Sequence, residues 1–302
     1  MAAPRPIENR LLGIGLRIAA ATSFALMAAT IKLAYAAEVA PLETIFYRSA
    51  FALPIVLAWM AATGSLMAWR TQRPLAHVWR ATIGFSAMML SFTALDYLPL
   101  AEATTIGFAA PLFATILSAL ILKEKVGWHR WSAVAIGFAG VLLVMRPHGE
   151  QIPVIGLMLA LGGAFLTSVV FITLRQIGRT ESTSTLVLWF TILAALAAGT
   201  TLPWTARSHD GTVWLILFAI GALGGIGQIL MTASLRFAPV STVVPFDYAQ
   251  LLWAVLLGWI LFETQPASTT WAGAAIIVGS GLYTLHRERV LGRAKTEPAA
   301  GA

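Results

Sequence analysis

The feature that most constrains this chain is a series of apolar segments, each about 20 residues long, that recurs from end to end with short charged stretches between them. That length is what an α-helix needs to cross the hydrocarbon core of a bilayer. With 58% hydrophobic residues, 11% charged residues and a mean hydropathy of +0.80, the chain of 302 residues lacks the polar surface of a soluble protein. We therefore expect an integral membrane protein.

The apolar segments predict ten transmembrane helices. Their expected bounds are Gly13–Ala36, Pro41–Ala62, Val78–Leu98, Leu100–Leu122, Trp128–Met145, Pro153–Leu174, Ser184–Pro203, Val213–Arg236, Pro239–Phe262 and Ser268–Leu285. A transmembrane β-barrel would need shorter segments that alternate strictly between apolar and polar residues, which runs such as "IGFAAPLFATILSALIL" lack. The predicted fold class is all-α.

The basic residues predict how the helices are oriented. If the N-terminus is cytoplasmic, the inside segments carry Arg5, Arg10, Arg17, Arg70, Arg73, Arg80, Lys123, Lys125, Arg130, Arg175, Arg179, Arg236, Arg287, Arg289, Arg293 and Lys295. The outside loops carry only Arg146 and Arg207. Such asymmetry follows the positive-inside rule, so we expect both termini on the cytoplasmic side of the cell inner membrane. The net charge of +7 then faces anionic lipid, and no nucleic-acid partner is expected.

The two halves of the chain resemble each other when one is laid over the other at a nearly constant offset. "ALDYLPLAEAT" matches "SLRFAPVSTVV", with Pro99 over Pro239, and "ALILKEKVG" matches "GWILFETQP". Because each half holds five predicted helices, an odd number, the second half must enter the membrane the other way up. Inverted repeats of this kind are typical of secondary transporters, whose substrate site lies near the midplane between the repeats.

Over nearly its whole length, and most specifically in "DYLPLAEATTIGFAAPLFATILSALILKEKVGWHRWSAVAIGFAGVLLVMRP" and "RFAPVSTVVPFDYAQLLWAVLLGWILFETQP", the sequence resembles the EamA-type branch of the drug/metabolite transporter superfamily. The resemblance implies two inverted five-helix repeats, a central cavity, and uptake or efflux of small metabolites. We expect the first repeat at residues 11–147, the second at 153–286, and a cytoplasmic tail at 287–302. The family usually has Gly before the Glu that ends helices four and nine, where this chain has Lys123 and Phe262.

Several charged residues lie inside or at the ends of the predicted helices. Lys32, near the end of the first helix, and Glu43, near the start of the second, lie at similar depth, so the sequence predicts an ion pair between them. Glu102, in the first turn of helix four, is favoured there by the helix dipole. Glu124 and Glu263 end helices four and nine, and each is expected to accept a hydrogen bond from free amides at the start of the next helix. We expect structural roles for these charges.

Arg48 and Asp247 are harder to explain by packing, because both lie deep in predicted helices. At 1.5 Å per residue, Arg48 lies roughly 15 Å and Asp247 roughly 13 Å from the nearest turn. A charge at a helix centre costs about 2.5–3.5 kcal/mol on insertion scales. Two interpretations remain open: either the two residues face a wet cavity, or they pair with each other.

Helical spacing supports the cavity. Asp247 and Gln250 share a face of the ninth helix, Thr104 and Phe108 share one of the fourth, and Gln228 lies on the eighth. Interhelical packing is the alternative explanation. The predicted cavity residues are Asp247, Gln250, Tyr248, Arg48, Gln228, Thr104 and Phe108.

These observations favour a transporter over an enzyme. The chain has no Cys, its five His residues lie at or outside helix ends, and no nucleotide-binding loop follows a strand, so we expect no metal site and no cofactor. The predicted function is secondary active transport of a small metabolite, such as an amino acid or a vitamin-like amphiphile, by alternating access, with coupling to a proton or a counter-substrate. The main alternative is a small-solute channel or facilitator, although the polar residues concentrate near mid-depth, whereas a channel needs a continuous polar stripe.

Overall fold

The computed structural model describes residues 9–121, 123, 126–144, 153–178, 180–238 and 243–296, and every regular element in these ranges is helical. In chain order the elements are α1 (Arg10–Ala36), α2 (Pro41–Ala62), η1 (Leu66–Trp69), α3 (Pro74–Tyr97), α4 (Leu100–Gly107), α5 (Ala110–Leu120), α6 (Trp128–Val144), α7 (Val154–Ile177), α8 (Thr183–Gly199), α9 (Leu202–Thr205), α10 (Gly211–Phe237), η2 (Val244–Tyr248), α12 (Ala249–Phe262) and α13 (Ser268–Thr296). The all-α prediction is confirmed.

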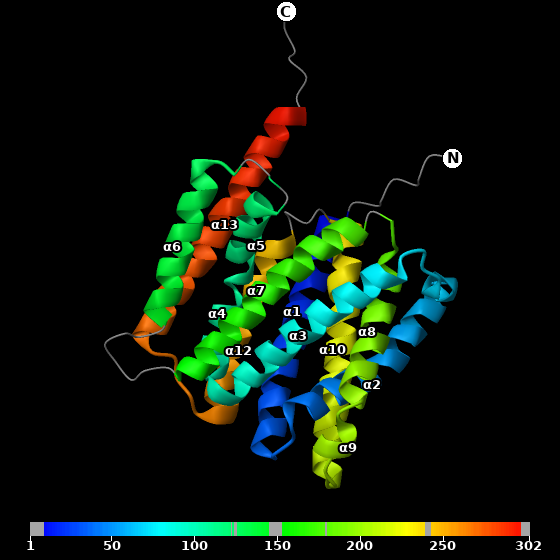
Figure 1. Cartoon of the computed structure of the whole chain (residues 1–302). Coiled ribbons are helices and arrows are strands. Elements are labelled where there is room, and N and C mark those ends of the chain that lie inside the picture. The colour runs from blue at the N-terminus through cyan, green and yellow to red at the C-terminus, as the bar shows by residue number, and fades with distance from the viewer. Residues whose placement is uncertain are drawn as a thin grey trace, which may run out of the picture.

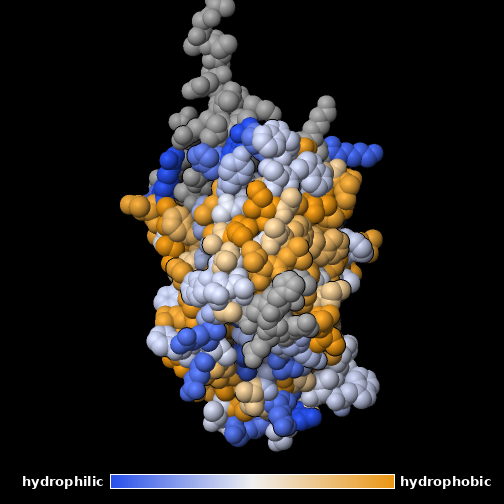
Figure 2. Space-filling model, turned by 90° about the vertical axis from the view of Figure 1, so that its left-hand side faces the viewer, coloured by the Kyte–Doolittle hydropathy of each residue, from blue (hydrophilic) through white to orange (hydrophobic). Residues whose placement is uncertain are grey.

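All ten predicted spans have counterparts among these elements. Seven described helical segments are long and apolar enough to cross a membrane, with α4 and α5 counted together and η2 and α12 counted together, and α6 and α8 are shorter apolar helices. The tenth span is the first part of α13, which continues past its predicted end to Thr296. Figure 2 shows apolar side chains gathered across the middle of one face and polar ones more frequent toward its ends. The molecule is a multi-pass helical membrane protein.

The helices of the two repeats pack in matching pairs. The first helix of each repeat lies against the third helix of the other, α1 against α10 and α7 against α3. The second helices, α2 and α8, pack together at one side of the bundle, and the fifth helices, α6 and α13, pack together at the other (Figure 1). Since α1 descends and α7 rises in the same view, the second repeat is inverted relative to the first.

Close contacts confirm the relation between α1 and α7. A Cβ atom added to Gly13 of α1 would lie 2.7 Å from the Cβ of Ala238, just beyond the end of α10. A Cβ added to Gly156 of α7 would lie 2.9 Å from Leu98, just beyond the end of α3. Leu98 and Ala238 directly precede Pro99 and Pro239, the prolines that coincide when the two halves are overlaid, so they are equivalent positions. Each first helix therefore needs a glycine to approach the opposite repeat.

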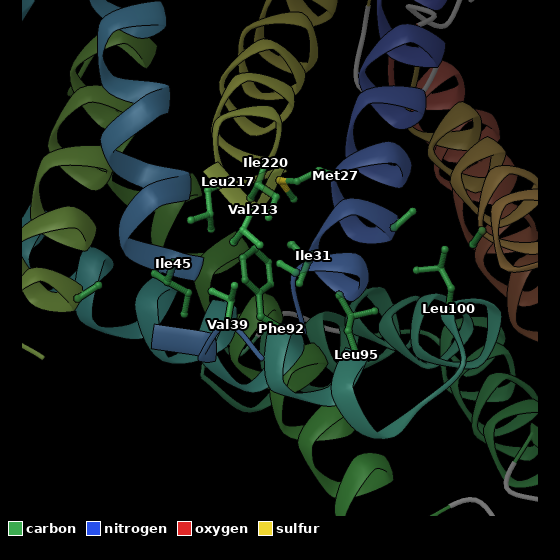
Figure 3. Packing of buried hydrophobic residues seen from close by; sticks show 14 residues of the cluster. Met27, Ile31, Val39, Ile45, Phe92, Leu95, Leu100, Val213, Leu217 and Ile220 are labelled. Atoms are coloured by element: carbon green, nitrogen blue, oxygen red, sulfur yellow. The ribbon is translucent and has the colours of Figure 1, made fainter. Parts of the chain in front are cut away.

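The largest described core cluster lies where α1, α2, α3, α4 and α10 meet. Ile31 of α1, Phe92 of α3 and Leu217 of α10 belong to this cluster (Figure 3). Ile31 and Leu217 are fully buried. Apolar burial has no driving force between helices that are already in lipid, so dispersion contacts and close fit hold this cluster together. It fixes α1 of the first repeat to α10 of the second.

The predicted ion pair between Lys32 and Glu43 is wrong. The Lys32 ammonium group instead donates hydrogen bonds of 2.9 Å to the carbonyl oxygens of Leu95 and Leu98, at the end of α3. Glu43 is fully buried, and its carboxylate lies 2.8 Å from Nε2 of His209. The cause is that α1 packs mainly on α10 and barely on α2, so the charges of this hairpin find partners on other elements. Lys32 thereby satisfies helix-end carbonyls that lack an intrahelical donor.

The ends of helices four and nine also differ from the expectation. The residues that follow α5 and α12 include Lys123, with φ of 52°, and Glu263, with φ of 53°, so each repeat has a left-handed residue in the turn after its fourth helix. The Glu263 carboxylate is exposed and makes no hydrogen bond in the described part of the chain; the Thr264 hydroxyl instead donates to the carbonyl of Gly258. The left-handed turn, and not a carboxylate clamp, ends α12. Glu124 lies outside the described residues.

The bundle has a basic end, defined as the end at which α1 begins and α13 finishes, where Arg10, Arg73 and Arg287 lie. The positive-inside rule predicts that this end is cytoplasmic. Because the chain has no Cys, one introduced Cys can report each side. We expect an impermeant maleimide added outside intact cells to label Arg207→Cys, at the opposite end, and to leave Leu75→Cys unlabelled.

Both positions are exposed, with relative accessibilities of 66% for the Arg207 side chain and 83% for Leu75, so burial does not bias this comparison. His209 would be a poor probe, because its side chain is only 5% exposed. Lysing the cells should make Leu75→Cys reactive. Labelling of Leu75→Cys alone in intact cells would show that the orientation is reversed.

Candidate functional site

Helices four and nine are both interrupted inside the bundle, which the sequence did not predict. Helix four divides into α4 and α5 around Phe108 and Ala109, and helix nine begins as the 3-10 helix η2 before α12. Pro111 lies in the first turn of α5, and Pro245 in the first turn of η2. Proline has no amide hydrogen to donate, so the regular hydrogen bonds stop there. The single faces expected along each helix are therefore divided between two segments.

The two interruptions meet. The rings of Phe108 and Tyr248 lie 4.8 Å apart between centroids, at an interplanar angle of 57°. These residues coincide when Pro99 is laid over Pro239, so they are equivalent positions of the two repeats. Interrupted helices are tolerated in a membrane where the backbone is buried in protein or lines a cavity, and they form the substrate sites of many transporters. The contact places two predicted site residues at the interface of the repeats.

Asp247 binds an arginine from the opposite repeat. Nε of Arg17 on α1 donates a hydrogen bond of 2.5 Å to one carboxylate oxygen, and a terminal guanidinium nitrogen donates to the other. Arg17 is buried, with 7% relative exposure, whereas the Asp247 side chain is 33% exposed. Such a two-point contact fixes orientation as well as distance. One edge of Asp247 thus remains accessible beside the Phe108–Tyr248 contact.

The pairing of Asp247 with Arg48 that the sequence left open is therefore wrong. Arg48 lies elsewhere, between α1, α2 and α10: a Cβ added to Gly224 would lie 3.0 Å from both its Nε and the sulfur of Met27. Depth along a helix could not distinguish Arg17 from Arg48 as the partner, because the choice depends on which helices pack together. From the charge pattern alone, Arg17 is one of the basic residues of the cytoplasmic side, so the sequence did not indicate it as a partner of Asp247.

The remaining predicted site residues, Gln228, Gln250 and Thr104, lie on α10, α12 and α4. Gln228 on α10 and Gln250 on α12 are half-buried, and neither side chain makes a hydrogen bond within the described part of the chain. The Thr104 hydroxyl of α4 donates to the carbonyl of Leu100 at 2.8 Å, so its hydrogen is used within its own helix. The two glutamines are the amide groups that remain available to a ligand, and their role in a cavity stays a prediction.

Two surface hollows lie away from this interface. One, of about 350 Å³, lies between α6 and α13 beside His129 and Tyr283, and the other, of about 310 Å³, lies beside Trp259 and Trp271. Neither is lined by a predicted cavity residue. Within the described ranges, no group of three or more His, Asp or Glu side chains is placed to hold a metal ion. The chemistry of the interface is thus that of aromatic rings, amides and a partly exposed ion pair.

The sequence profile of the EamA-like transporter family matches residues 11–146 and 154–285, which together cover most of the chain. The chain belongs to the EamA-like transporter family. This EamA-like transporter is therefore a membrane transporter of small metabolites. Its fold also resembles a crystal structure with a TM-score of 0.65, at 22% identity, over 94% of this chain and 99% of the other.

Relatives of this EamA-like transporter include proteins of two named substrate classes. It is 32% identical to a riboflavin transporter of Vibrio cholerae over 76% of this chain and 77% of the relative. It is 29% identical to a riboflavin transporter of Brucella anthropi, over 80% and 87%. A third relative, the S-adenosylmethionine uptake transporter of Rickettsia prowazekii, is 26% identical over 82% and 83%.

The Arg17–Asp247 pair predicts a specific pattern of stability changes. Asp247→Asn should lower the melting temperature, because it leaves the buried Arg17 charge without its partner. Removing one partner of a buried pair costs about 3–5 kcal/mol, and the partial exposure of Asp247 places this pair below that range. Adding Arg17→Gln should restore stability, whereas adding Arg48→Gln should not. Equal rescue by both double variants would contradict the assigned pairing.

The close approach of Gly281 on α13 to Tyr248 leads to a second prediction. A Cβ at Gly281 would collide with the Tyr248 hydroxyl, whereas a Cβ at Gly279, two residues earlier, would meet nothing within 4 Å. Overpacking of this kind typically costs about 1–3 kcal/mol. We expect Gly281→Ala to lower the melting temperature and the transport rate and Gly279→Ala to change neither. If Gly281→Ala behaved like its control, Tyr248 would not be held against α13.

Proposed function

We propose that the protein is a secondary active carrier that moves a small metabolite with a planar ring by alternating access at the interface of its repeats. The observation that carries the proposal is the contact between Phe108 and Tyr248, two equivalent residues at the interruptions of helices four and nine. Opposite breaks in inverted repeats allow the halves to exchange conformations around one site. The two aromatic faces would stack on a flat ligand.

The comparisons support the choice of ring. Riboflavin and S-adenosylmethionine, which name the relatives described above, both contain a planar nitrogen heterocycle. The half-buried amides of Gln228 and Gln250 offer donors and acceptors for the edge of such a ring. Small-molecule sites commonly combine apolar faces with a few polar groups in this way. A vitamin-like heterocycle therefore fits better than an aliphatic amino acid.

We also propose that the carrier lies in the cell inner membrane with both termini in the cytoplasm. The basic end of the bundle supports this orientation. Coupling to a proton or to a counter-substrate belongs to the same proposal. Asp247 is the described carboxylate at the interface, and its partial exposure would let it exchange between Arg17 and a proton or ligand. A small-solute channel or facilitator is the alternative, and a channel differs in a measurable way, because it shows neither saturation nor counterflow.

The test begins with a thermal-shift screen of purified protein, since a ligand that binds the folded state raises its melting temperature. Riboflavin, S-adenosylmethionine and aromatic amino acids form the planar set, and ribitol and alanine form the non-planar set. We expect stabilisation in the planar set only. The stabilising compound should then show saturable uptake and counterflow in proteoliposomes.

Variants make this test specific to the interface. Phe108→Ala and Tyr248→Ala should each lower the rate of counterflow at least tenfold, whereas Phe218→Ala, at a ring that is 51% exposed on α10, should leave it unchanged. Uptake without saturation or counterflow would reject the carrier in favour of a channel. Normal counterflow in both Phe108→Ala and Tyr248→Ala would reject the aromatic contact as the substrate site.

A further inference from the structure

Two buried arginines lie outside the Asp247 site. Arg48 of α2 and Arg80 of α3 have relative exposures of 6% and 7%. Nε of Arg48, and Nε and one terminal nitrogen of Arg80, are buried without a hydrogen-bond partner. Neither side chain makes a hydrogen bond or an ion pair with any residue in the described ranges. The chain thus keeps two guanidinium groups inside a membrane protein without satisfying them.

Arg48 on α2 and Arg80 on α3 are like charges on two helices that pack against each other and against α8. The guanidinium carbon of Arg80 lies 3.9 Å from the ring centroid of Phe190 on α8. Arg48 lies against Gly224 of α10 and near Met27 of α1. Buried charges are normally paired, and a buried pair of like charges between apolar groups is unfavourable unless a counter-ion joins it.

The repeat symmetry shows that both arginines occupy prepared positions. Gly84 on α3 and Gly224 on α10 are equivalent positions of the two repeats. A Cβ at Gly84 would lie 2.9 Å from the Phe190 ring and 3.0 Å from a terminal nitrogen of Arg80, and a Cβ at Gly224 would lie 3.0 Å from Nε of Arg48. Two equivalent glycines therefore leave room for these arginine side chains. Arginines on the protein surface would not need such room.

The carboxylates on neighbouring elements bind other groups. Glu43, on the same helix as Arg48, binds His209. Glu181, before α8, accepts a hydrogen bond from the Thr71 hydroxyl, and its other oxygen lies 3.7 Å from Nε2 of His77. Asp247 binds Arg17. Since no carboxylate in the described ranges binds Arg48 or Arg80, a counter-ion would come from outside the described chain.

We propose that Arg48 and Arg80 form an oxyanion site that binds the carboxylate or phosphate group of the transported metabolite. The guanidinium group presents paired N–H donors that match the geometry of both oxyanions, and two such groups can hold one anion from two sides. The assignment to the metabolite rests on the carrier function proposed above, and the oxyanion site itself does not.

The contact of Arg80 with Phe190 suggests a purely structural explanation, in which a cation–aromatic contact holds α3 against α8. That explanation leaves Arg48 unaccounted for, since no described aromatic ring or carboxylate binds it. The two explanations also predict opposite effects of neutral substitution. Loss of a structural contact destabilises the protein, whereas removal of one of two repelling buried charges does not.

The experiment measures the melting temperature of the purified protein with sodium phosphate or sodium benzoate, at an ionic strength held constant with sodium chloride. We expect a saturable rise in the wild-type protein. The rise should vanish in Arg48→Gln and in Arg80→Gln, and it should persist in Arg70→Gln, a control at the basic end. Without added oxyanion, neither site variant should melt below the wild type. Absence of a saturable rise in the wild type, or its persistence in both site variants, would overturn the proposal.

Arg48→Lys and Arg80→Lys keep the charge but lose the paired donors, so they should fold and bind the anions at least fivefold more weakly. A second arm identifies the source of the oxyanion by comparing riboflavin, riboflavin 5′-phosphate and inorganic phosphate. Tighter binding of the phosphorylated ring than of either separate compound supports the metabolite as the source. Equal binding of inorganic phosphate overturns that assignment and leaves a site for a free anion. Because these measurements need no transport, they stand even if counterflow fails.

Discussion

The absence of water from the bilayer is the constraint on which the rest of this structure depends, because each charge in a helix must find its partner within the protein. The chain meets it in three ways. Lys32 donates to the carbonyls that end α3, and Arg17 binds Asp247 across the repeats. Arg48 and Arg80 have no described partner, and in our account a ligand supplies it. In this account, the charges that have a partner in the protein stabilise the fold, and the charges without one bind the substrate.

The repeats share a backbone plan but not their charges. Equivalent positions interrupt helices four and nine at Phe108 and Tyr248, and equivalent glycines admit Phe190 in one half and Arg48 in the other. The acid of the central ion pair has no acidic counterpart, since the first repeat has Gly107 at the position equivalent to Asp247. Symmetry of the backbone allows the halves to exchange conformations. The asymmetry of charge then gives the ligand a defined orientation.

Hydropathy and charge spacing were enough to predict the spans and the inverted repeats, because these depend on local composition and length. Side-chain partners were not predictable from the same information. Lys32 and Glu43 are neighbours in one hairpin, yet α1 packs on α10, so their charges separate. Arg17 fits the pattern of a cytoplasmic basic residue, although its distance from the start of α1 places it deep enough to reach η2. The prolines at 111 and 245 are the signal for the interruptions, but the apolar pattern that predicts both helices continues through them.

Alternating access at the repeat interface is the central claim, and the most direct measurement is the reactivity of Gln250→Cys, the only Cys in that variant, from each side of the membrane. A membrane-impermeant reagent would be applied to right-side-out and to inside-out vesicles. The account predicts modification from both sides, slowed in each case by the ligand found in the thermal-shift screen. Modification from one side only, unaffected by that ligand, would contradict it.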